Sequence, residues 1–305
     1  MKSDEDHYGE VLEDVSSERS LLFTVDVEDW FQVENFKKYV PFSSWPSYGM
    51  RVQENTQRLL DLLESSGNVH ATFFVLGWIA ARLPKLVEEI KQRGHEVASH
   101  GFKHELCHEQ SSKRLHNDLS DSKKLLEDII GDSISGYRAP SFSINEYALG
   151  VVRECGFQYD SSYNSFQMNK RYGQMDLSRY KKKGISYELG PSFYELPISN
   201  LPFRGSSVPW GGGGYFRLIP SKIYRHGIRR ILKREDAYLF YIHPWEIDSN
   251  QPRITTASFF SQFRHRINLA SSWKKLADLL TRFNNCRFLT CKEYLAENGC
   301  METHL

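Results

Sequence analysis

The stretch LLFTVDVEDW, residues 21–30, begins as an apolar run and ends with three carboxylates, Asp26, Glu28 and Asp29. An apolar run of this length is typical of a buried strand. Like charges this close repel one another, so their grouping costs free energy unless a cation, a proton or solvent relieves it. The stretch therefore predicts either a solvated turn after the strand or a positively charged group at its end.

Apolar and amphipathic segments alternate along the rest of the chain. Clear further strands are expected at residues 71–77, 95–100 and 238–244. Helical spacing of apolar residues predicts helices at 52–64, 84–93, 112–130, 147–154, 219–234, 257–269 and 272–283. Repeated strand and helix alternation favours a parallel sheet with helices outside, and the number of repeats favours a closed barrel over an open sheet.

Three regions are expected along the chain. Residues 1–20 hold seven acidic and two basic residues without an apolar stretch, which predicts a disordered leader. Residues 21–248 are expected to form the barrel. Residues 249–305 are expected to form an extension that packs on the barrel through an apolar stripe of Phe259, Phe260, Phe263 and Leu269.

The composition is that of a globular protein without a strong charge. The chain has 305 residues, 40% of them hydrophobic, and a formal net charge of +1. This balance gives no field that would indicate a nucleic acid or an anionic membrane as a partner. No run approaches the roughly 18 apolar residues of a spanning helix. The five cysteines are odd in number and scattered, so we expect a reducing, cytoplasmic setting.

His100 and His104 form the clearest candidate metal site. They lie four positions apart, so on a helical turn both rings would project to one side and share an ion. Such pairs are common by chance, and a carboxylate from residues 26–29 is the expected third ligand. Two histidines and one carboxylate leave coordination positions open, as in hydrolytic rather than structural metal sites.

Polar side chains follow several of the expected strands. In parallel barrels the reacting groups lie at the carboxyl ends of the strands, and here acids, histidines or an arginine end four of them. The run PWGGGGYFR, residues 209–217, contains four successive glycines that cannot form a stable strand or helix interior. It predicts either a flexible loop or a place where the backbone closely approaches a ligand.

Five sequence motifs, taken in their order along the chain, resemble those of a known family. TVDVEDWF (24–31), the block at 71–104, GYRAPSFS (136–143), YDSS (159–162) and LFYIHPWEID (239–248) resemble polysaccharide deacetylases of carbohydrate esterase family 4. They most resemble the branch associated with exopolysaccharide loci of exosortase-bearing bacteria. The resemblance implies an α/β fold, a distorted (β/α) barrel of about seven strands with a helical C-terminal extension. It also implies a divalent metal, with zinc expected, and hydrolysis of N-acetyl groups from an amino-sugar polysaccharide.

The resemblance assigns roles to residues of the metal site. Asp26 resembles the general base that takes a proton from the attacking water, and His100 and His104 resemble the paired metal ligands. The third ligand is uncertain because the family pattern has two adjacent aspartates, whereas Val27 intervenes here. Glu28 and Asp29 are both candidates. Strand alternation places Glu28 on the same side as Asp26 and favours it slightly.

Further roles follow from the remaining motifs. Arg138 resembles the arginine that pairs with the base, and Ser141, after Pro140, supplies the expected oxyanion N–H. His243 resembles the acid that protonates the departing amine, with Asp160 and Glu195 as alternative residues to orient it.

The expected substrate contacts are Pro140, Trp210, Tyr215 and Trp245.

Two other functions remain open from the sequence. Relatives on this fold include allantoinase-like and cyclic imide hydrolases, which cleave a ring amide. A sugar-binding relative that has lost turnover is the second alternative, disfavoured because base, ligands, arginine and acid are all present. The expected partner is an N-acetylated polysaccharide or oligosaccharide, without nucleic acid and without a membrane span.

Overall fold

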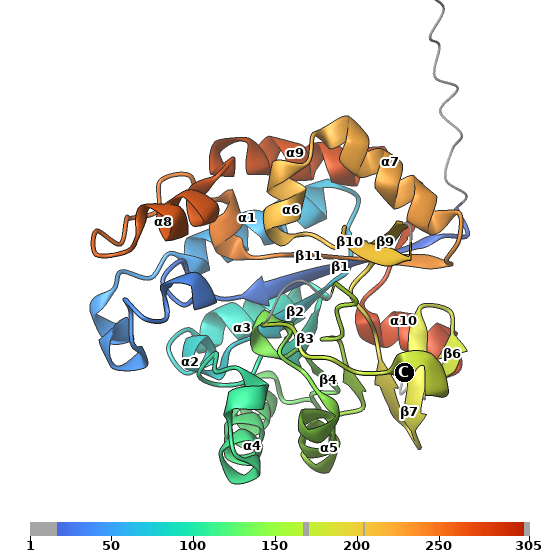
Figure 1. The fold of residues 1–305 in the computed structure, drawn as a ribbon, viewed down its shortest axis with the longest axis horizontal. Helices are drawn as coiled ribbons and strands as arrows, with labels where there is room; N and C mark the ends of the chain where they lie inside the picture. Colours follow the sequence, from blue (N-terminus) through green and yellow to red (C-terminus); the bar gives the residue numbers. More distant parts are fainter. Residues whose placement is uncertain (1–16, 167–170, 204, 302–305) are drawn as a thin grey trace, which may run out of the picture.

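The computed structural model describes residues 17–166, 171–203 and 205–301. Residues 1–16, most of the expected leader, lie outside the described residues. Among the described residues, seven strands pair in parallel in the spatial order β11, β1, β2, β3, β4, β5 and β8 (Figure 1). Their bounds are Ser20–Val27 (β1), Ala71–Val75 (β2), Glu96–Ser99 (β3), Gly136–Tyr137 (β4), Tyr159–Asp160 (β5), Phe193–Glu195 (β8) and Ala237–Ile242 (β11). The expected fold class is confirmed.

The sheet is a curled half-barrel and not a closed ring. After β8 it continues antiparallel through β7 (Ser186–Gly190) and β6 (Lys181–Lys183), so β11 and β6 are the two ends of the order. A separate hairpin joins β9 (Asn200–Phe203) to β10 (Ser206–Pro209). The expectation of a closed barrel is therefore wrong, because residues 181–209 form antiparallel hairpins, so the order of strands does not return from β6 to β11.

Ten α-helices and six short 3-10 helices are present in the described residues. The α-helices are Val52–Ser65 (α1), Gly77–Ala80 (α2), Pro84–Gln92 (α3), Ser112–Ile130 (α4), Glu146–Glu154 (α5), Gly213–Leu218 (α6), Ser221–Leu232 (α7), Phe259–Arg266 (α8), Leu269–Arg282 (α9) and Cys291–Glu297 (α10). The 3-10 helices are Glu34–Phe36 (η1), Phe42–Ser47 (η2), Cys107–Glu109 (η3), Pro140–Phe142 (η4), Leu177–Arg179 (η5) and Pro244–Ile247 (η6). Each of the seven helices expected from the sequence is present.

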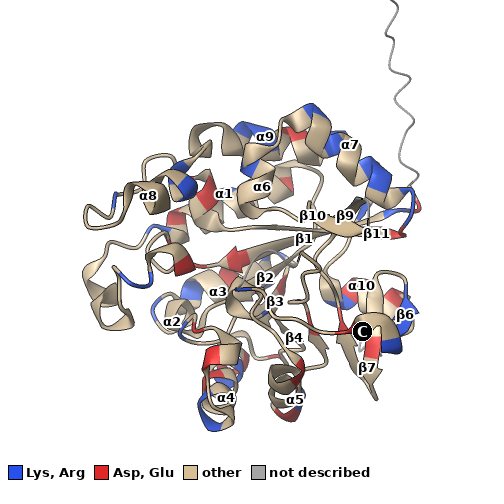
Figure 2. Ribbon diagram, in the orientation of Figure 1, with Lys and Arg blue, Asp and Glu red and all other residues tan. Residues whose placement is uncertain are grey.

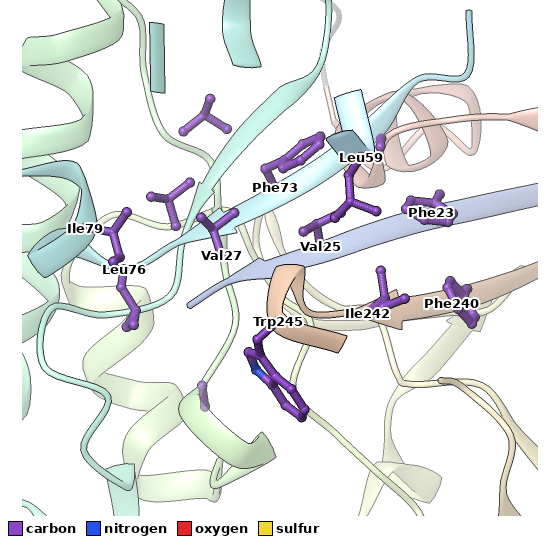
Figure 3. Close-up of a cluster of buried hydrophobic side chains, with 14 of the residues drawn as sticks. Phe23, Val25, Val27, Leu59, Phe73, Leu76, Ile79, Phe240, Ile242 and Trp245 are labelled. Carbon is purple, nitrogen blue, oxygen red and sulfur yellow. The ribbon is translucent and has the colours of Figure 1, made fainter. Parts of the chain in front are cut away.

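β1 lies at the centre of the core and is buried on both faces. Phe23, Val25 and Val27 face one side, where they pack with residues of β2, β11 and α1 (Figure 3). Leu22 belongs to a second cluster on the other side. This two-sided burial explains why the strand is apolar almost throughout. Alternation also fixes the orientation of Asp26, which is buried with a relative exposure of 2%.

The extension packs on the barrel, but not through the expected stripe. Phe259, Phe260 and Phe263 of α8 are 85%, 71% and 52% exposed, whereas Leu269 is buried. The only buried residue of α8 is His265. The prediction that the three phenylalanines of α8 pack on the barrel was therefore wrong, because the helix buries His265 and not its apolar residues. The extension instead buries one face of α9 and pairs β12 (Arg287–Phe288) with β1.

The glycine run lies against the protein's own strand β11. The Tyr241 N–H donates to the Gly211 carbonyl at 2.7 Å. A Cβ on Gly212, whose φ is +143°, would lie 1.9 Å from the Tyr241 carbonyl oxygen. Glycine is needed here because a side chain would collide with β11. Close packing therefore replaces the interpretation of a flexible loop, and α6 begins directly at Gly213. Gly214 lines the cavity described below, so close approach of the backbone to a ligand stays a prediction.

Charged side chains lie mainly on the outer elements. Figure 2 shows basic residues along α7 and α9, whereas acidic residues gather at the end of β1 inside the molecule. None of the helices in the described part of the chain combines the length and the apolar character that crossing a bilayer requires.

Candidate active site

Four side chains with expected roles follow directly after parallel strands. Glu28 follows β1, His100 follows β3, Arg138 follows β4 and His243 follows β11. Glu28 and His243, together with Asp26 and His104, line one cavity of about 580 Å³. The candidate site residues therefore lie at the carboxyl ends of parallel strands, where the reacting groups of barrel enzymes lie.

Glu28, His100 and His104 form a group that fits a metal ion. One potential ligand atom from each lies within 4.8 Å of the others, and all three residues are buried. The Glu28 Oε1 atom is 3.8 Å from His100 Nε2, and Glu28 Oε2 is 3.5 Å from His104 Nε2. Both Glu28 Oε2 and His100 Nε2 are buried without a hydrogen-bond partner. Such orphaned atoms are costly, and a cation between them would satisfy both.

The electrostatics of this group favour a carboxylate at Glu28. Burial would raise the pKa of Glu28, but the charges of His104 and His243 outweigh it and hold the pKa well below its usual value. Burial would likewise lower the pKa of His104, but the nearby Glu28 charge raises it. A divalent cation would take the place of these protons, because ligand histidines must be neutral.

A loop, and not a helical turn, brings the two histidines together. After β3 the backbone turns at Gly101, with φ of +73°, and at His104, with φ of +54°. Asp118 of α4 accepts hydrogen bonds from the N–H groups of Phe102 and Lys103 at 2.7 and 3.2 Å and so fixes this loop. The sequence prediction of a helical turn was wrong, although its conclusion that the rings meet was right.

Arg138 fixes both a metal ligand and the expected base. Its carbonyl oxygen lies 2.8 Å from His100 Nδ1, which directs His100 Nε2 toward the metal group. Its Nη1 donates to Asp26 Oδ1 and to Thr24 Oγ1, each at 2.7 Å. Arg138 is fully buried and also donates to Ser161. A buried arginine held this way fixes the direction of the Asp26 carboxyl group, which lines the cavity.

Asp29 does not join the metal group. Its oxygens accept the N–H groups of Trp30, Arg51 and Val52 at 2.9, 2.8 and 3.1 Å. Burial raises the pKa of Asp29 to about 6, and these hydrogen bonds counteract it only in part. The structure thus separates the two candidates for the third ligand: Glu28 faces the histidines, and Asp29 holds the start of α1.

The Ser141 segment lines the same cavity in a strained conformation. Ser141 and Phe142 have φ values of +52° and +58°, which side-chain-bearing residues rarely adopt. Both residues line the cavity, whereas Pro140 is buried and is not among its lining residues. Strain of this kind is concentrated at functional sites, in keeping with the expected role of the Ser141 N–H.

His243 is oriented by Glu246, a residue that the sequence analysis did not identify. His243 Nδ1 lies 2.6 Å from Glu246 Oε1, and Arg217 Nε donates to Glu246 Oε2 at 2.7 Å. Burial would lower the pKa of His243, but the charges of Glu28 and Glu246 raise it well above its usual value. Glu246 lies in the same HPWE stretch as His243, so its spacing of three residues was a visible signal.

The two expected orienting residues serve another segment. Asp160 and Glu195 are fully buried, and both accept the Ser162 N–H. Ser162 Oγ in turn accepts the Ala139 N–H at 2.7 Å. Neither carboxylate is paired with His243 in the described residues. They support the YRAP segment, so the proposal that one of them orients His243 was wrong.

The four expected substrate contacts divide into two groups. Tyr215 and Trp245 line the cavity, and Trp245 stacks on His243 with ring centroids 5.1 Å apart. Trp210 does not line it. Its Nε1 donates to the Tyr224 carbonyl and its ring stacks on that residue in the core. Trp210 and Pro140 are therefore structural, and Tyr215 and Trp245 remain candidates.

Comparison with known proteins agrees with this geometry. Residues 40–159 match the family described as polysaccharide deacetylase, and residues 161–296 match a domain of unknown function, DUF3473. The chain carries a polysaccharide deacetylase domain. DUF3473 fits the C-terminal part of the chain and includes Glu195, His243 and most of the extension.

Relatives of this deacetylase domain are similar over only part of their length. The peptidoglycan-N-acetylglucosamine deacetylase of Bacillus cereus is 33% identical over 103 residues, which are 34% of this chain and 47% of the relative. The peptidoglycan deacetylase of Helicobacter pylori is 31% identical over 111 residues, 36% and 38% of the two chains. This chain thus spans less than half of either relative.

A solved structure from Mycobacterium smegmatis supports the fold over nearly the whole chain. It has a TM-score of 0.59 and 21% sequence identity, and the match covers 94% of this chain and 92% of that one. At this identity the similarity concerns the fold of the deacetylase domain and its extension.

Proposed function

We propose that this protein hydrolyses N-acetyl groups of an amino-sugar polysaccharide, with an exopolysaccharide as the substrate and a divalent ion, zinc, as the cofactor. The observation that carries the proposal is the convergence of the Glu28, His100 and His104 group with Asp26 and His243 on one cavity. The names of the relatives, which describe deacetylation of N-acetylglucosamine in peptidoglycan, support the same bond type.

Each step of the hydrolysis has a residue suited to it. When bound by Glu28, His100 and His104, a divalent ion supplies Lewis acidity toward the acetamide carbonyl and lowers the pKa of water. Asp26 takes the proton of the attacking water as the new C–O bond forms. The Ser141 N–H donates toward the developing oxyanion.

His243 completes the reaction by donating a proton to the amide nitrogen as the C–N bond breaks. Acetate and a free amine on the sugar are the products. Asp26 and His243 face each other across a short gap, with Asp26 Oδ2 3.8 Å from His243 Nε2. A proton gained by Asp26 and one lost by His243 balance the reaction.

A matched pair of neighbouring carboxylates provides the test. Acetate release from N-acetylglucosamine oligomers and zinc content are measured for the wild type, Glu28→Gln and Asp29→Asn. We expect Glu28→Gln to lose zinc and to lower acetate release by at least about 100-fold, because metal hydrolases depend on their ligands. Asp29→Asn, the control, should keep both the zinc and most of the activity.

Other outcomes separate the remaining possibilities. Acetate release that survives chelation or Glu28→Gln shows that the proposed mechanism is wrong. Turnover of allantoin but not of the oligomers by the same zinc-loaded preparation assigns a ring amide as the substrate. Tight binding of oligomers without acetate release indicates a sugar-binding relative.

A further inference from the structure

Three phenylalanines on α8 are unusually exposed. Phe259, Phe260 and Phe263 are 85%, 71% and 52% exposed, and the rings of Phe259 and Phe263 lie parallel with centroids 6.3 Å apart. We call these three residues the α8 ridge. Apolar side chains grouped on a surface commonly mark a binding site, because exposing them to water without a ligand is unfavourable.

The α8 ridge is continuous with the active-site cavity. Phe260 and Phe263 line the cavity that Glu28 and His243 also line. A volume of about 580 Å³ is within the range of sites for small ligands. A polysaccharide with one acetamide at the metal group would therefore continue past the cavity mouth, where the ridge lies.

Other residues that line the same cavity are also apolar or aromatic. Tyr215 and Phe166 line the cavity, with their rings edge to face at 6.0 Å, and Leu218 beside them is 49% exposed. Pyranose rings present C–H faces that pack on aromatic rings, while their hydroxyl groups stay in water. The ridge and these residues together offer a sugar chain apolar and aromatic surface at the cavity.

The anchoring of α8 keeps the ridge at the mouth. His265 Nε2 lies 2.6 Å from Gln251 Oε1, and its ring stacks on Trp245 at 4.3 Å. Trp245 in turn stacks on His243. The helix that carries the ridge is thus packed directly against the residues around the expected acid.

We propose that the α8 ridge binds the sugar residues next to the one being deacetylated, so that this enzyme prefers a glycan chain to a single acetylated sugar. This inference rests on the proposed function. A membrane would be the other partner for exposed phenylalanines, but two of the three line the catalytic cavity, which favours the substrate. Binding energy gained away from the reacting bond then raises kcat/KM for longer chains.

The test compares substrate lengths. Acetate release is measured on N-acetylglucosamine oligomers from the dimer to the hexamer for the wild type and the double variant Phe260→Ala/Phe263→Ala. We expect kcat/KM for the hexamer to fall about tenfold, since each aromatic contact contributes a few-fold in affinity, and kcat/KM for the dimer to change by less than about twofold. Tyr147→Ala, an exposed aromatic of α5 that does not line the cavity, is the matched control.

Binding without turnover separates this inference from the proposed function. Hexamer affinity is measured on Asp26→Asn with and without the double substitution, and we expect the double substitution to weaken it about tenfold. Weaker hexamer binding with no acetate release in the wild type overturns the proposed function alone. If the double substitution lowers kcat/KM equally for oligomers of all lengths, or does not lower it, the proposed role of the ridge is wrong. Loss of binding to phosphatidylglycerol vesicles with oligomer binding unchanged also overturns this role and would assign the ridge to a membrane.

Discussion

At the scale of single residues, position in the turn after β1 and not chemical type separates Glu28 from Asp29. β1 ends at Val27, and the Glu28 N–H donates to the Asp26 carbonyl in the turn that follows. Glu28 points to His100 and His104, whereas Asp29 accepts backbone N–H groups at the start of α1. The turn after β1 thus gives two adjacent acids different surroundings. His104 and His243 hold the pKa of Glu28 well below its usual value, whereas N–H donors counteract the burial of Asp29 only in part.

Glu246 is expected to act on catalysis through His243. Glu246→Gln keeps the shape but weakens the charge that holds the protonated ring, so kcat on an N-acetylglucosamine oligomer should fall about 100-fold, with KM changed little. An ester with a good leaving group, 4-nitrophenyl acetate, needs no protonation of that group. Its hydrolysis should fall by less than about threefold, because only the acid step is impaired.

Asp248→Asn is the control for this comparison. Asp248 is two residues along the chain and pairs with Arg51 and not with His243. The variant should leave the ratio of amide to ester hydrolysis as in the wild type. Equal losses on both substrates in Glu246→Gln would show that Glu246 supports only the fold around His243.

At the scale of elements, strand ends were predictable and loop geometry was not. Periodicity located the strands that precede Glu28, His100 and His243, because a buried strand has a local pattern. The turn that unites His100 and His104 has none. It depends on positive φ values in the loop and on Asp118, which is distant in sequence. The sequence thus predicted which residues meet, and only the structure shows how.

Asp118 should make stability depend on pH. Burial, followed by the nearby Glu105 charge, raises the pKa of Asp118 from 3.8 to about 6 in spite of two N–H donors. Because the folded-state pKa is above the unfolded one, folding favours the protonated form. Relative to Asp118→Asn, the wild type should be most stable below about pH 4 and lose up to about 3 kcal/mol as the pH rises to 6 and above.

Urea unfolding of both proteins between pH 4 and pH 8 measures this difference. Asp121→Asn, which removes a carboxylate from the same helix α4 at a side chain exposed to solvent, is the control and should give a curve parallel to the wild type. If the Asp118→Asn and wild-type curves also run parallel across this range, Asp118 is not a buried carboxyl of raised pKa.

At the scale of the whole molecule, the extension reaches the active site through one buried arginine. Arg217 donates to Glu246, and its Nη1 also donates to the carbonyls of His265 and Ile267 at 2.9 and 2.7 Å. These contacts join α6, η6 and the end of α8. The sequence predicted that the extension packs on the barrel, but it named the wrong residues, because a buried polar contact over about 50 positions has no periodic pattern. The division at residues 248 and 249 stays a prediction.

A double-mutant cycle tests whether Arg217 and Glu246 act as one unit. Arg217→Met or Glu246→Gln alone removes one partner of a buried ion pair, and such changes cost about 3–5 kcal/mol of unfolding free energy. The double variant leaves no uncompensated charge between them. We therefore expect it to be more stable than the sum of the single losses predicts, by about 2 kcal/mol, in urea unfolding of the four proteins.

Arg51 provides the matched cycle. It pairs with Asp248 on the other side of η6, so Arg51→Met and Glu246→Gln should be additive within about 0.5 kcal/mol. Additivity in the Arg217 cycle as well would mean that the extension and the acid are stabilised independently. Coupling in the first cycle and additivity in the second would show that the extension holds the carboxylate that orients His243, which makes residues 249–301 part of the catalytic support as well as of the sugar-facing surface.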